Sequence, residues 1–198
     1  MTMEEEKMKN RTAILLAGGK STRMGSDKGL LRFRNKPFIQ YSIDAVRPLV
    51  DDIIIVSNSS DYDQFDTTRV ADIIPDSGPV GGLHSGLLHS TTTNNIVLSC
   101  DAPLITTHLL QKLIDHEEHD IDAVVLKAGQ KIMPLIGTYQ KRCAQLCEEH
   151  LKNNTLRLRD VISKLNTKII HLPPKEHALV VNINTKDELN QMIHATTH

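Results

Sequence analysis

The sequence predicts an α/β fold in which one mostly parallel sheet lies between two layers of helices. Short apolar runs rich in β-branched residues recur along the chain, and segments with helical periodicity or turn signals separate them. The runs at 53–57 and 95–99 also have unbroken apolar centres. Such centres are typical of strands that helices cover on both faces. We therefore expect a single-domain, three-layer α/β/α sandwich.

The expected elements alternate along the chain. The strands are predicted at residues 12–16, 53–57, 70–74, 95–99 and 123–126. The helices are predicted at residues 38–46, 82–89, 107–117, 141–152 and 156–165. Thr185 and Glu188 form a capping box, which predicts the start of a last helix that continues to Ile193.

The first eleven residues differ from the rest of the chain. Residues 1–11 are rich in charged side chains and lack the apolar segment of a signal peptide, so we expect a flexible N-terminal segment there. No repeat or linker interrupts residues 12–198, which we expect to form one domain. The chain has three cysteines without a Cys-x-x-Cys pair, a pattern that disfavours a disulfide framework. The expected location is the cytoplasm.

Composition excludes two classes of partner. The formal net charge is −1, aromatic residues make up 3% of the chain, and tryptophan is absent. Nucleic-acid-binding proteins have basic faces and aromatic platforms for bases, so we expect no nucleic-acid partner. No apolar run approaches the roughly 18 residues of a membrane helix, so we expect no membrane partner.

The segment from Leu15 to Lys28 carries the strongest functional signal. Three glycines follow an apolar run in this segment, together with the cations Lys20, Arg23 and Lys28. Glycine lets backbone amides approach a ligand closely, and the cations supply the charge that a triphosphate needs. Ile14 stands where a P-loop would require glycine, and the GxGxxG fingerprint is absent. The segment therefore predicts a phosphate-binding loop of another kind.

Side chains at other strand ends should meet this loop. Ligands of open parallel sheets bind beyond the carboxyl ends of the strands, so one crevice should collect the loops that begin at Ala17, Asn58, Pro75 and Cys100. Asp101 ends an apolar run, and Pro103 then turns the chain away. Mg²⁺ commonly takes one or two carboxylates together with phosphate oxygens and water. Asp101 is therefore the candidate Mg²⁺ ligand.

The glycine-rich segment closely resembles the signature of nucleotidyltransferases with a glycosyltransferase-A, Rossmann-like fold, Leu-Ala-Gly-Gly-x-Ser-x-Arg-Met-Gly-x-x-Lys. Every specified position is filled between Leu16 and Lys28. The Ala-Gly-Gly form most resembles the molybdenum cofactor guanylyltransferases. This resemblance implies transfer of GMP from GTP to the terminal phosphate of molybdopterin or the molybdenum cofactor, with release of pyrophosphate and with Mg²⁺ as cofactor. It implies that Arg23, Lys28 and Asp101 are catalytic and that Asp101 binds the metal.

Other segments are similar to further motifs of that family. Cys100 to Pro103 matches C-D-x-P, and Asp76 precedes a Gly-Pro segment, as does a family aspartate that helps to recognise the nucleotide. The segment 180–189 resembles a motif from which we expect Asn182 and Asn184 at the acceptor site. The GTP site that the resemblance implies consists of Leu16, Ala17, Gly18, Gly19, Lys28, Asn58, Asp76 and Asp101.

Two positions depart from the family pattern. Lys186 replaces a proline that begins a helix, which removes local rigidity and no chemical group. Met133 stands where the family commonly has a histidine before a proline. Any role of that histidine in acceptor binding therefore does not transfer to this chain.

Three alternative functions remain open on sequence. A cytidylyltransferase and a sugar-phosphate nucleotidyltransferase would use the same loop, and a non-catalytic protein could bind the nucleotide in order to deliver the cofactor. The expected partners are GTP and molybdopterin or the molybdenum cofactor, together with other cofactor-biosynthesis proteins or apo-molybdoenzymes. Release of pyrophosphate separates the enzymes from the delivery protein.

Overall fold

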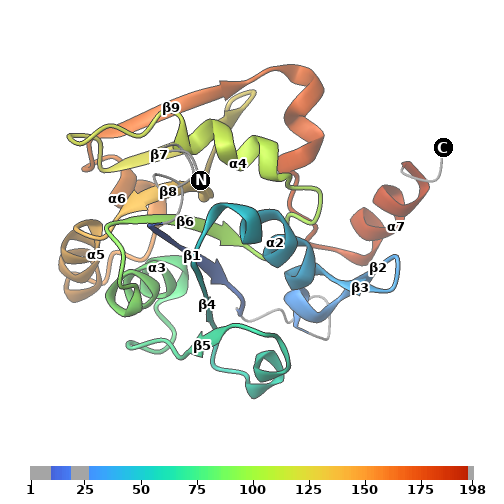
Figure 1. The fold of residues 1–198 in the computed structure, drawn as a ribbon, viewed down its shortest axis with the longest axis horizontal. Helices are drawn as coiled ribbons and strands as arrows, with labels where there is room; N and C mark the ends of the chain where they lie inside the picture. The colour runs from blue at the N-terminus through green and yellow to red at the C-terminus, as the bar shows by residue number, and fades with distance from the viewer. Residues whose placement is uncertain (1–9, 19–26, 196–198) are drawn as a thin grey trace, which may run out of the picture.

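A single sheet organises the computed structural model, which describes residues 10–18 and 27–195. Its seven strands lie in the order β5-β4-β1-β6-β8-β7-β9 (Figure 1). Neighbouring strands are parallel except at β8, which runs antiparallel to both β6 and β7. The strands are β1 (Arg11–Leu16), β4 (Asp52–Val56), β5 (Thr68–Val70), β6 (Asn94–Ser99), β7 (Ala123–Ala128), β8 (Lys131–Gln140) and β9 (Thr167–Leu172).

Helices cover both faces of this sheet. One face packs against α2 (Phe38–Val46) and α4 (Thr107–Ile114), and the other face packs against α3 (Gly78–His89), α5 (Cys143–Lys152) and α6 (Leu158–Ile162). Figure 1 shows these two groups on opposite sides of the strands. The predicted three-layer α/β/α sandwich is confirmed.

The two sides of the core follow the alternation of side chains along the central strands. In β1, Ala13 and Leu15 belong to the apolar cluster beneath α2 and α4, whereas Ile14 belongs to the cluster beneath α3. All three side chains are fully buried. Successive side chains of a strand point to opposite faces of the sheet, so a strand covered on both faces must be apolar throughout.

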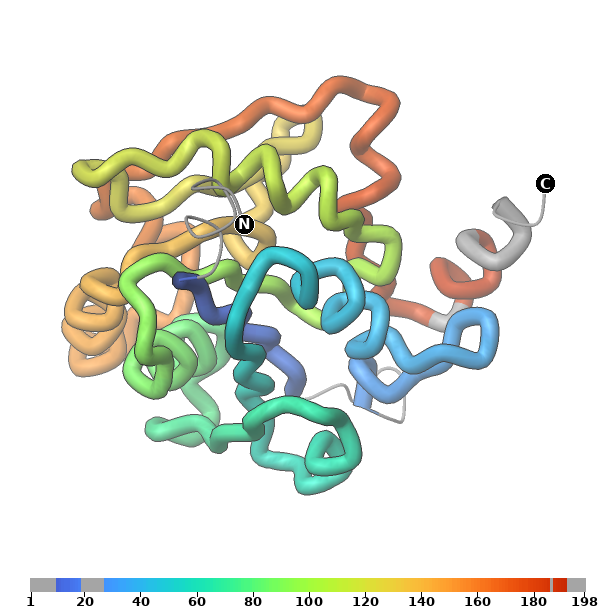
Figure 2. The backbone as a smooth tube through the Cα atoms, in the orientation of Figure 1, coloured from blue at the N-terminus to red at the C-terminus, as the bar shows by residue number. Residues whose placement is uncertain are grey.

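A small unit lies beside the main sandwich. It contains the hairpin of β2 (Arg32–Phe33) and β3 (Lys36–Pro37) and the C-terminal helix α7 (Lys186–Ala195). In Figure 2 the hairpin and this helix lie next to each other, away from the sheet. Phe33 of the hairpin and Leu189 of the helix share an apolar cluster with Ile183, and this cluster joins the unit to the start of α2.

Short 3₁₀ helices complete the described fold. They are η1 (Lys28–Leu30), η2 (Arg47–Leu49), η3 (Ser60–Gln64) and η4 (Pro174–Val180). Two of them, η1 and η3, follow β1 and β4 in the sequence and lie beyond the carboxyl ends of those strands.

Several predicted elements match the observed ones. The helix predicted at 38–46 is α2, and the strands predicted at 12–16 and 95–99 are one residue shorter than β1 and β6. The capping box is also confirmed, because Thr185 Oγ1 accepts a hydrogen bond from Glu188 N at 3.1 Å and Glu188 Oε2 accepts one from Thr185 N at 3.0 Å.

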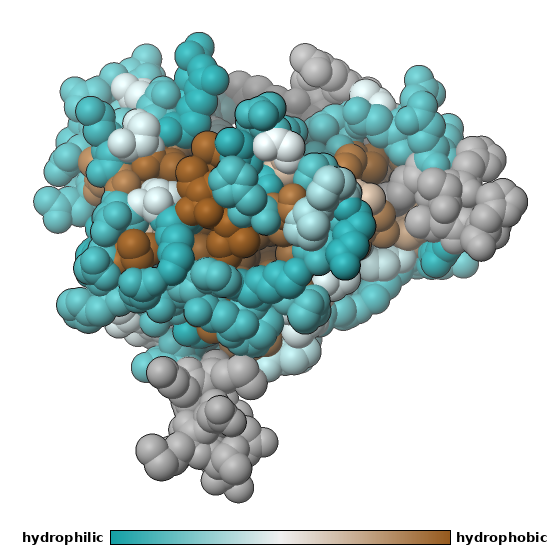
Figure 3. All heavy atoms as spheres, turned by 90° about the horizontal axis from the view of Figure 1, so that it is seen from above, coloured by the Kyte–Doolittle hydropathy of each residue, from teal (hydrophilic) through white to brown (hydrophobic). Residues whose placement is uncertain are grey.

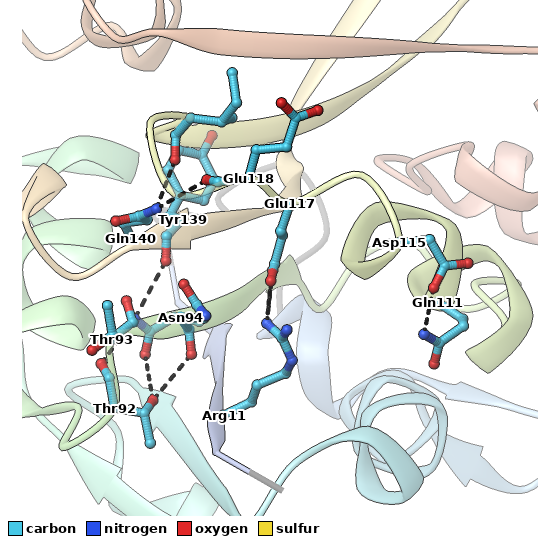
Figure 4. A network of polar contacts seen from close by, with 12 residues as sticks. Arg11, Thr92, Thr93, Asn94, Gln111, Asp115, Glu117, Glu118, Tyr139 and Gln140 are labelled. Carbon is cyan, nitrogen blue, oxygen red and sulfur yellow. Dashed lines mark hydrogen bonds and ion pairs between the residues drawn. The ribbon is translucent and has the colours of Figure 1, made fainter. Parts of the chain in front are cut away.

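Arg11 is a correction to the boundary that we expected for the N-terminal segment. It pairs with Asn94 in the sheet and is the first residue of β1. Its guanidinium also forms a salt bridge of 2.6 Å with Glu117, which holds the residue at the amino end of the sheet (Figure 4). Residues 1–9 lie outside the described part of the chain.

The structure corrects several other boundaries, and the helix predicted at 156–165 is the shorter α6 at 158–162. The strand predicted at 70–74 is observed at 68–70, and Ile73 and Ile74 are exposed in the loop that follows. The helix predicted at 82–89 begins at Gly78 because Pro79 occupies its first turn, where a missing amide hydrogen costs no hydrogen bond. The helix predicted at 107–117 ends at Ile114.

Strands β8 and β9 of the main sheet had no counterpart among the predicted elements, and neither had the hairpin strands β2 and β3. Pro134 and Gly137 make β8 resemble a turn in sequence. The pairing of β7 with β8 shifts register between Val125 and Leu126, so residues 134–136 have no partner in β7 and the proline needs none there, while Ile136 still pairs with Leu98 of β6.

The surface of the described residues is mostly polar. Figure 3 views the molecule from above and shows apolar atoms between hydrophilic side chains on that face. None of the helices in residues 10–18 and 27–195 combines the length and the apolar character needed to cross a membrane.

Candidate active site

A pocket of about 680 Å³ lies beyond the carboxyl ends of β1, β4 and β6. The four loops that we expected to converge all contribute to it, which confirms that prediction. Its lining includes Leu16, Ala17, Gly18, Asp27, Lys28, Ser57, Asn58, Ser59, Asp72, Asp76, Gly78, Pro79, Gly82, Ser99, Cys100, Asp101 and Leu135.

Lys28 lies between two polar partners at one side of this pocket. Its Nζ donates a hydrogen bond of 2.6 Å to Asn184 Oδ1 and lies 3.9 Å from Asp101 Oδ2. The Lys28 and Asp101 side chains keep 25% and 15% of their exposure, so both are accessible from the pocket. The lysine from the glycine-rich segment, the aspartate after β6 and the asparagine near the C-terminus therefore form one cluster.

The backbone holds Asp101 and the segment 182–184 together. Ile183 N donates a hydrogen bond of 2.8 Å to Asp101 O, and the Ile183 side chain is buried in the small cluster with Phe33 and Phe38. Asn184 Nδ2 in turn contacts Asn182 O at 3.4 Å. The C-terminal segment is thus anchored beside the aspartate by packing as well as by hydrogen bonds.

One carboxylate oxygen of Asp101 can accept a contact from a ligand. Its Oδ1 is buried and has no hydrogen-bond partner among the residues that the structure describes, and the same holds for Asn182 Oδ1. A buried polar atom without a partner is costly unless a ligand satisfies it. Carboxylate and amide oxygens are hard ligands that suit Mg²⁺. These two residues fit a Mg²⁺ ion.

A site with a single carboxylate also suits a metal that the substrate helps to bind. The described residues contain no group of three or more His, Cys, Asp and Glu side chains arranged to hold a metal ion. Mg²⁺ in phosphate-transfer sites is held by few protein oxygens and completes its octahedron with phosphate oxygens and water. The donor set around Asp101 therefore fits a metal that binds together with a nucleotide.

Asn58 and Asp72 form a second polar pair on the opposite wall. Asn58 Oδ1 accepts a hydrogen bond of 3.0 Å from Asp72 N, and Asn58 Nδ2 donates one of 3.3 Å to Asp72 Oδ2. Asp72 Oδ1 is buried without a hydrogen-bond partner in the described part of the chain. Burial raises the pKa of Asp72 above its usual value, and the hydrogen bond from Asn58 opposes this shift.

The backbone around Gly18 brings β1 close to the pocket. Ala17 N donates to Val56 O at 3.0 Å, so the chain stays paired with β4 up to the edge of the pocket. The next residue, Gly18, has φ of +141°, a conformation that side chains disfavour. This turn lies at the edge of the pocket, which Gly18 lines.

The cysteine in the lining is not a nucleophile. Burial is the main reason that the pKa of the Cys100 thiol is raised far above its usual value, and the neighbouring Asp101 carboxylate adds to the shift. The thiol therefore stays protonated at neutral pH, and thiolate chemistry requires the ionised form.

Most of the expected site residues lie in or beside the pocket. Leu16, Ala17, Gly18, Lys28, Asn58, Asp76 and Asp101 line it. Asn184 contacts Lys28, and Asn182 is joined to Asn184. Gly19 and Arg23 lie outside the described residues. Met133 is buried in the main apolar cluster and is absent from the pocket lining, so this chain uses the position for packing.

Asp27 and Asp72 are polar residues of the pocket that sequence reasoning had not assigned to the site. Asp27 immediately precedes Lys28, and Asp72 precedes the Gly-Pro loop by several residues. The choice of Asp76 as the carboxylate of that loop depended on its distance from the glycines. The signal that points to Asp72 is its pairing with Asn58, which only the fold reveals.

Comparison with known proteins shows the family of this chain. The profile of the MobA-like NTP transferase domain matches residues 13–169. The chain belongs to this family. The matched region runs from within β1 to the middle of β9 and includes Lys28, Asn58, Asp72 and Asp101.

Curated relatives of this family member match over nearly their full length. It is 37% identical over 185 residues to a probable molybdenum cofactor guanylyltransferase of Flavobacterium johnsoniae, with 93% of this chain and 97% of the relative covered. It is 31% identical to the molybdenum cofactor guanylyltransferase of Vibrio vulnificus, with 90% and 92% covered.

A solved structure shares the fold. The crystal structure of molybdopterin-guanine dinucleotide biosynthesis protein A from Archaeoglobus fulgidus superimposes with a TM-score of 0.81 at 21% identity, and the alignment covers 94% of this chain and 98% of that one. The Rossmann-like nucleotidyltransferase fold that we expected is confirmed.

Proposed function

We propose that this protein transfers GMP from GTP to the terminal phosphate of molybdopterin or of its metal-loaded form, with release of pyrophosphate. The observation that carries this proposal is the cluster of Lys28, Asp101 and Asn184 at one wall of a pocket whose opposite wall holds Asn58 and Asp72. The names of the curated relatives point to the same activity.

The wall with Asn58 and Asp72 suits the guanine base. An ionised carboxylate only accepts hydrogen bonds, and guanine presents two adjacent donors on one edge, N1–H and N2–H. Asp72 Oδ1 has no partner among the described residues, so it has the capacity to accept such a bond. Asn58 holds this carboxylate in place through two hydrogen bonds.

The wall with Lys28 suits the triphosphate. Lysine places a compact positive charge against phosphate oxygens, and the amide groups of the glycine-rich turn around Gly18 add donors. We assign Arg23 and Gly19 to the same role on the basis of the sequence signature, since both lie outside the described residues. Asn184 orients the Lys28 ammonium by accepting its hydrogen bond.

Asp101, with Asn182 beside it, would hold Mg²⁺. When bound, this ion neutralises charge on the phosphate oxygens. The fit rests on the buried Oδ1 atoms of both residues, which have no partner in the described part of the chain. On the basis of the sequence motif, we also assign Asn182 and Asn184 to the terminal phosphate of the acceptor.

The reaction needs no nucleophile from the protein. An oxygen of the acceptor phosphate attacks the α-phosphorus of GTP, a new P–O–P linkage forms, and the bond to the β-phosphate oxygen breaks to release pyrophosphate. A phosphate monoester is ionised near neutral pH, so a general base contributes little. Rate enhancement then depends on positioning and on compensation of negative charge. The chain supplies both through Lys28 and its neighbours.

Cellular context is part of the proposal. We place the protein in the cytoplasm, where it would receive molybdopterin from other cofactor-biosynthesis proteins and pass the product to apo-molybdoenzymes. These partners are inferred from the chemistry of the substrate and of the product.

A pyrophosphate-release assay tests the function. The purified protein is incubated with Mg²⁺, molybdopterin and each of GTP, CTP, ATP and UTP, and the acceptor is then replaced by a panel of sugar phosphates. We expect release only with GTP and molybdopterin or its metal-loaded form. Preference for CTP would favour a cytidylyltransferase. Preference for a sugar phosphate as acceptor would favour a sugar-phosphate nucleotidyltransferase. Binding of GTP without release under any condition would favour a delivery protein.

A further inference from the structure

Lys28 is held by a contact that joins two loops of the pocket. Asp27 Oδ1 accepts a hydrogen bond of 2.5 Å from Tyr62 Oη and one of 3.0 Å from Gly29 N. Asp27 and Gly29 flank Lys28 in the sequence, whereas Tyr62 belongs to η3, which follows β4 and the loop with Asn58. A single carboxylate oxygen thus connects the turn that carries Lys28 to the other wall of the pocket.

We propose that Tyr62 and Asp27 are positioning residues that hold Lys28 against the nucleotide phosphates and couple it to the loop that contains Asn58. This inference rests on the proposed function, because it assigns a phosphate-binding role to Lys28. Neither residue needs to touch the reacting atoms.

The packing around Gly29 supports this role. A Cβ atom at Gly29 would overlap Tyr62 Oη and would lie only 3.0 Å from Cys100 Sγ. The turn therefore lies directly against both the tyrosine and the residue that precedes Asp101. A backbone in such close contact has little freedom to shift, so Lys28 is fixed relative to Asp101 as well as to Asn58.

The environment of Tyr62 makes its hydroxyl group a permanent donor. The side chain is fully buried in the main apolar cluster and packs against Phe65 in a tilted arrangement, with 6.1 Å between ring centroids. Burial raises the pKa of Tyr62 far above its usual value, so the hydroxyl keeps its proton at any physiological pH. Buried tyrosines need a partner for the hydroxyl, and here the partner is a carboxylate of the pocket.

The coupling has a chemical purpose. Phosphate transfer depends on placing the lysine within a fraction of an ångström, and a displacement of 1 Å can lower the rate by about a hundredfold. Lys28 lies on a short turn after residues 19–26, and the contacts of Asp27 and Gly29 tie this turn to the folded core. The neighbouring Ser59 supports η3 by accepting a hydrogen bond from Asp61 N at 3.2 Å.

Tyr62→Phe tests the proposal by removing one hydroxyl group while keeping the ring. We expect kcat for pyrophosphate release to fall by about tenfold, the size of one lost hydrogen bond to a charged group, while KM for GTP changes less than threefold. Tyr139→Phe is the matched control, because Tyr139 is 1% exposed and donates a bond of 2.6 Å to Pro134 O, outside the cluster around Lys28. We expect it to lower Tm with kcat nearly unchanged.

Two variants of Asp27 add a test by rescue. The amide oxygen of Asp27→Asn can accept the same two hydrogen bonds, whereas Asp27→Ala accepts neither, so we expect Asp27→Asn to retain at least about fivefold more activity. In the Asp27→Ala protein, the additional change Tyr62→Phe should lower kcat little further, because both substitutions remove the same hydrogen bond. Wild-type kcat in Tyr62→Phe, or an equal loss in Tyr139→Phe, would overturn the proposal.

A crystal structure of Tyr62→Phe separates this inference from the proposed function. We expect the hydrogen bond between Lys28 Nζ and Asn184 Oδ1 to be lost or lengthened. An unchanged contact would contradict the positioning role even if the enzyme proves to use another nucleotide. Wild-type protein that releases no pyrophosphate from GTP and molybdopterin would instead contradict the proposed function, and the structure of the variant would still decide the positioning role.

Discussion

Lys28 Nζ lies 3.9 Å from Asp101 Oδ2, although the two residues follow different strands and are far apart in the sequence. A cation and a carboxylate at this separation can bind the two components of a metal–nucleotide complex, the phosphate by the lysine and the metal by the aspartate. Their meeting in one pocket is the structural basis for the proposed activity.

Lys28→Ala removes the cation that we assign to the triphosphate. We expect kcat for pyrophosphate release to fall at least about a hundredfold, since loss of one preorganised charge contact costs on the order of 3 kcal/mol of transition-state stabilisation. Tm should change little. Lys168→Ala is the control, because that lysine forms an exposed ion pair with Glu118 and such pairs contribute under about 1 kcal/mol. Activity of Lys28→Ala equal to that of the control would contradict the role of Lys28.

Asp101→Asn replaces the proposed metal ligand without a change in shape. We expect the Mg²⁺ concentration for half-maximal activity to rise at least about tenfold and kcat to fall, because a neutral amide binds a hard cation more weakly than a carboxylate does. Titration of activity with Mg²⁺ at saturating GTP measures both effects. An unchanged Mg²⁺ dependence would exclude Asp101 as the ligand.

The sequence predicted the central part of this fold well and its edge poorly. Strands β1, β4 and β6 have the apolar centres that double-sided burial requires, and α2 has the expected bounds of 38–46. Strand β8 was missed because Pro134 and Gly137 are typical turn residues. The structure accommodates them with a bulge and with a close approach of Gly137 to Val124 O, neither of which a local pattern reveals.

The candidate site also contains residues that the sequence predicted and residues that it did not. The strand-end pattern predicted that the loops after the apolar strands would meet in one crevice, and the resemblance to the nucleotidyltransferase signature then singled out Lys28, Asn58 and Asp101. Asp72 and Tyr62 were not predicted, since their roles depend on contacts with Asn58 and Asp27 across the pocket. Pairwise contacts between distant segments leave no periodic signal in one sequence.

Asp72→Asn should reduce selectivity for guanine. Inosine triphosphate lacks the 2-amino group, so we expect the ratio of kcat/KM for GTP to that for inosine triphosphate to fall by about tenfold in the variant, the size of one charge-assisted hydrogen bond. Parallel assays with the two nucleotides measure this ratio. A ratio equal to that of the wild type would show that Asp72 does not contact the 2-amino group.

The same substitution should also stabilise the fold at neutral pH. Burial raises the pKa of Asp72, so the ionised carboxylate is less favourable in the folded chain than in the unfolded chain. This destabilisation is complete at pH values above the pKa of Asp72 in the folded chain. It disappears below about pH 4, where the carboxyl group is protonated in both the folded and the unfolded chain. We expect Tm of Asp72→Asn to exceed that of the wild type at pH 7 and to match it near pH 3.5. A lower Tm at pH 7 would contradict this.

Glu117→Ala should destabilise the fold without affecting the chemistry. Glu117 forms a salt bridge with Arg11 at the amino end of the sheet, and the two side chains are only 17% and 9% exposed (Figure 4). Removal of one partner leaves a largely buried charge, which costs about 3 kcal/mol. The adjacent Glu118→Ala breaks an exposed pair and should cost under about 1 kcal/mol. Urea denaturation of both variants, with kcat measured on the folded fraction, tests this difference.

A crystal structure with GTP and Mn²⁺ in place of Mg²⁺ would locate the nucleotide and, by anomalous scattering, the metal. We predict the metal on Asp101, the triphosphate against Lys28 and the guanine against Asn58 and Asp72, all within the pocket beyond β1, β4 and β6. A nucleotide bound at another surface, or a metal bound away from Asp101, would contradict the proposed function.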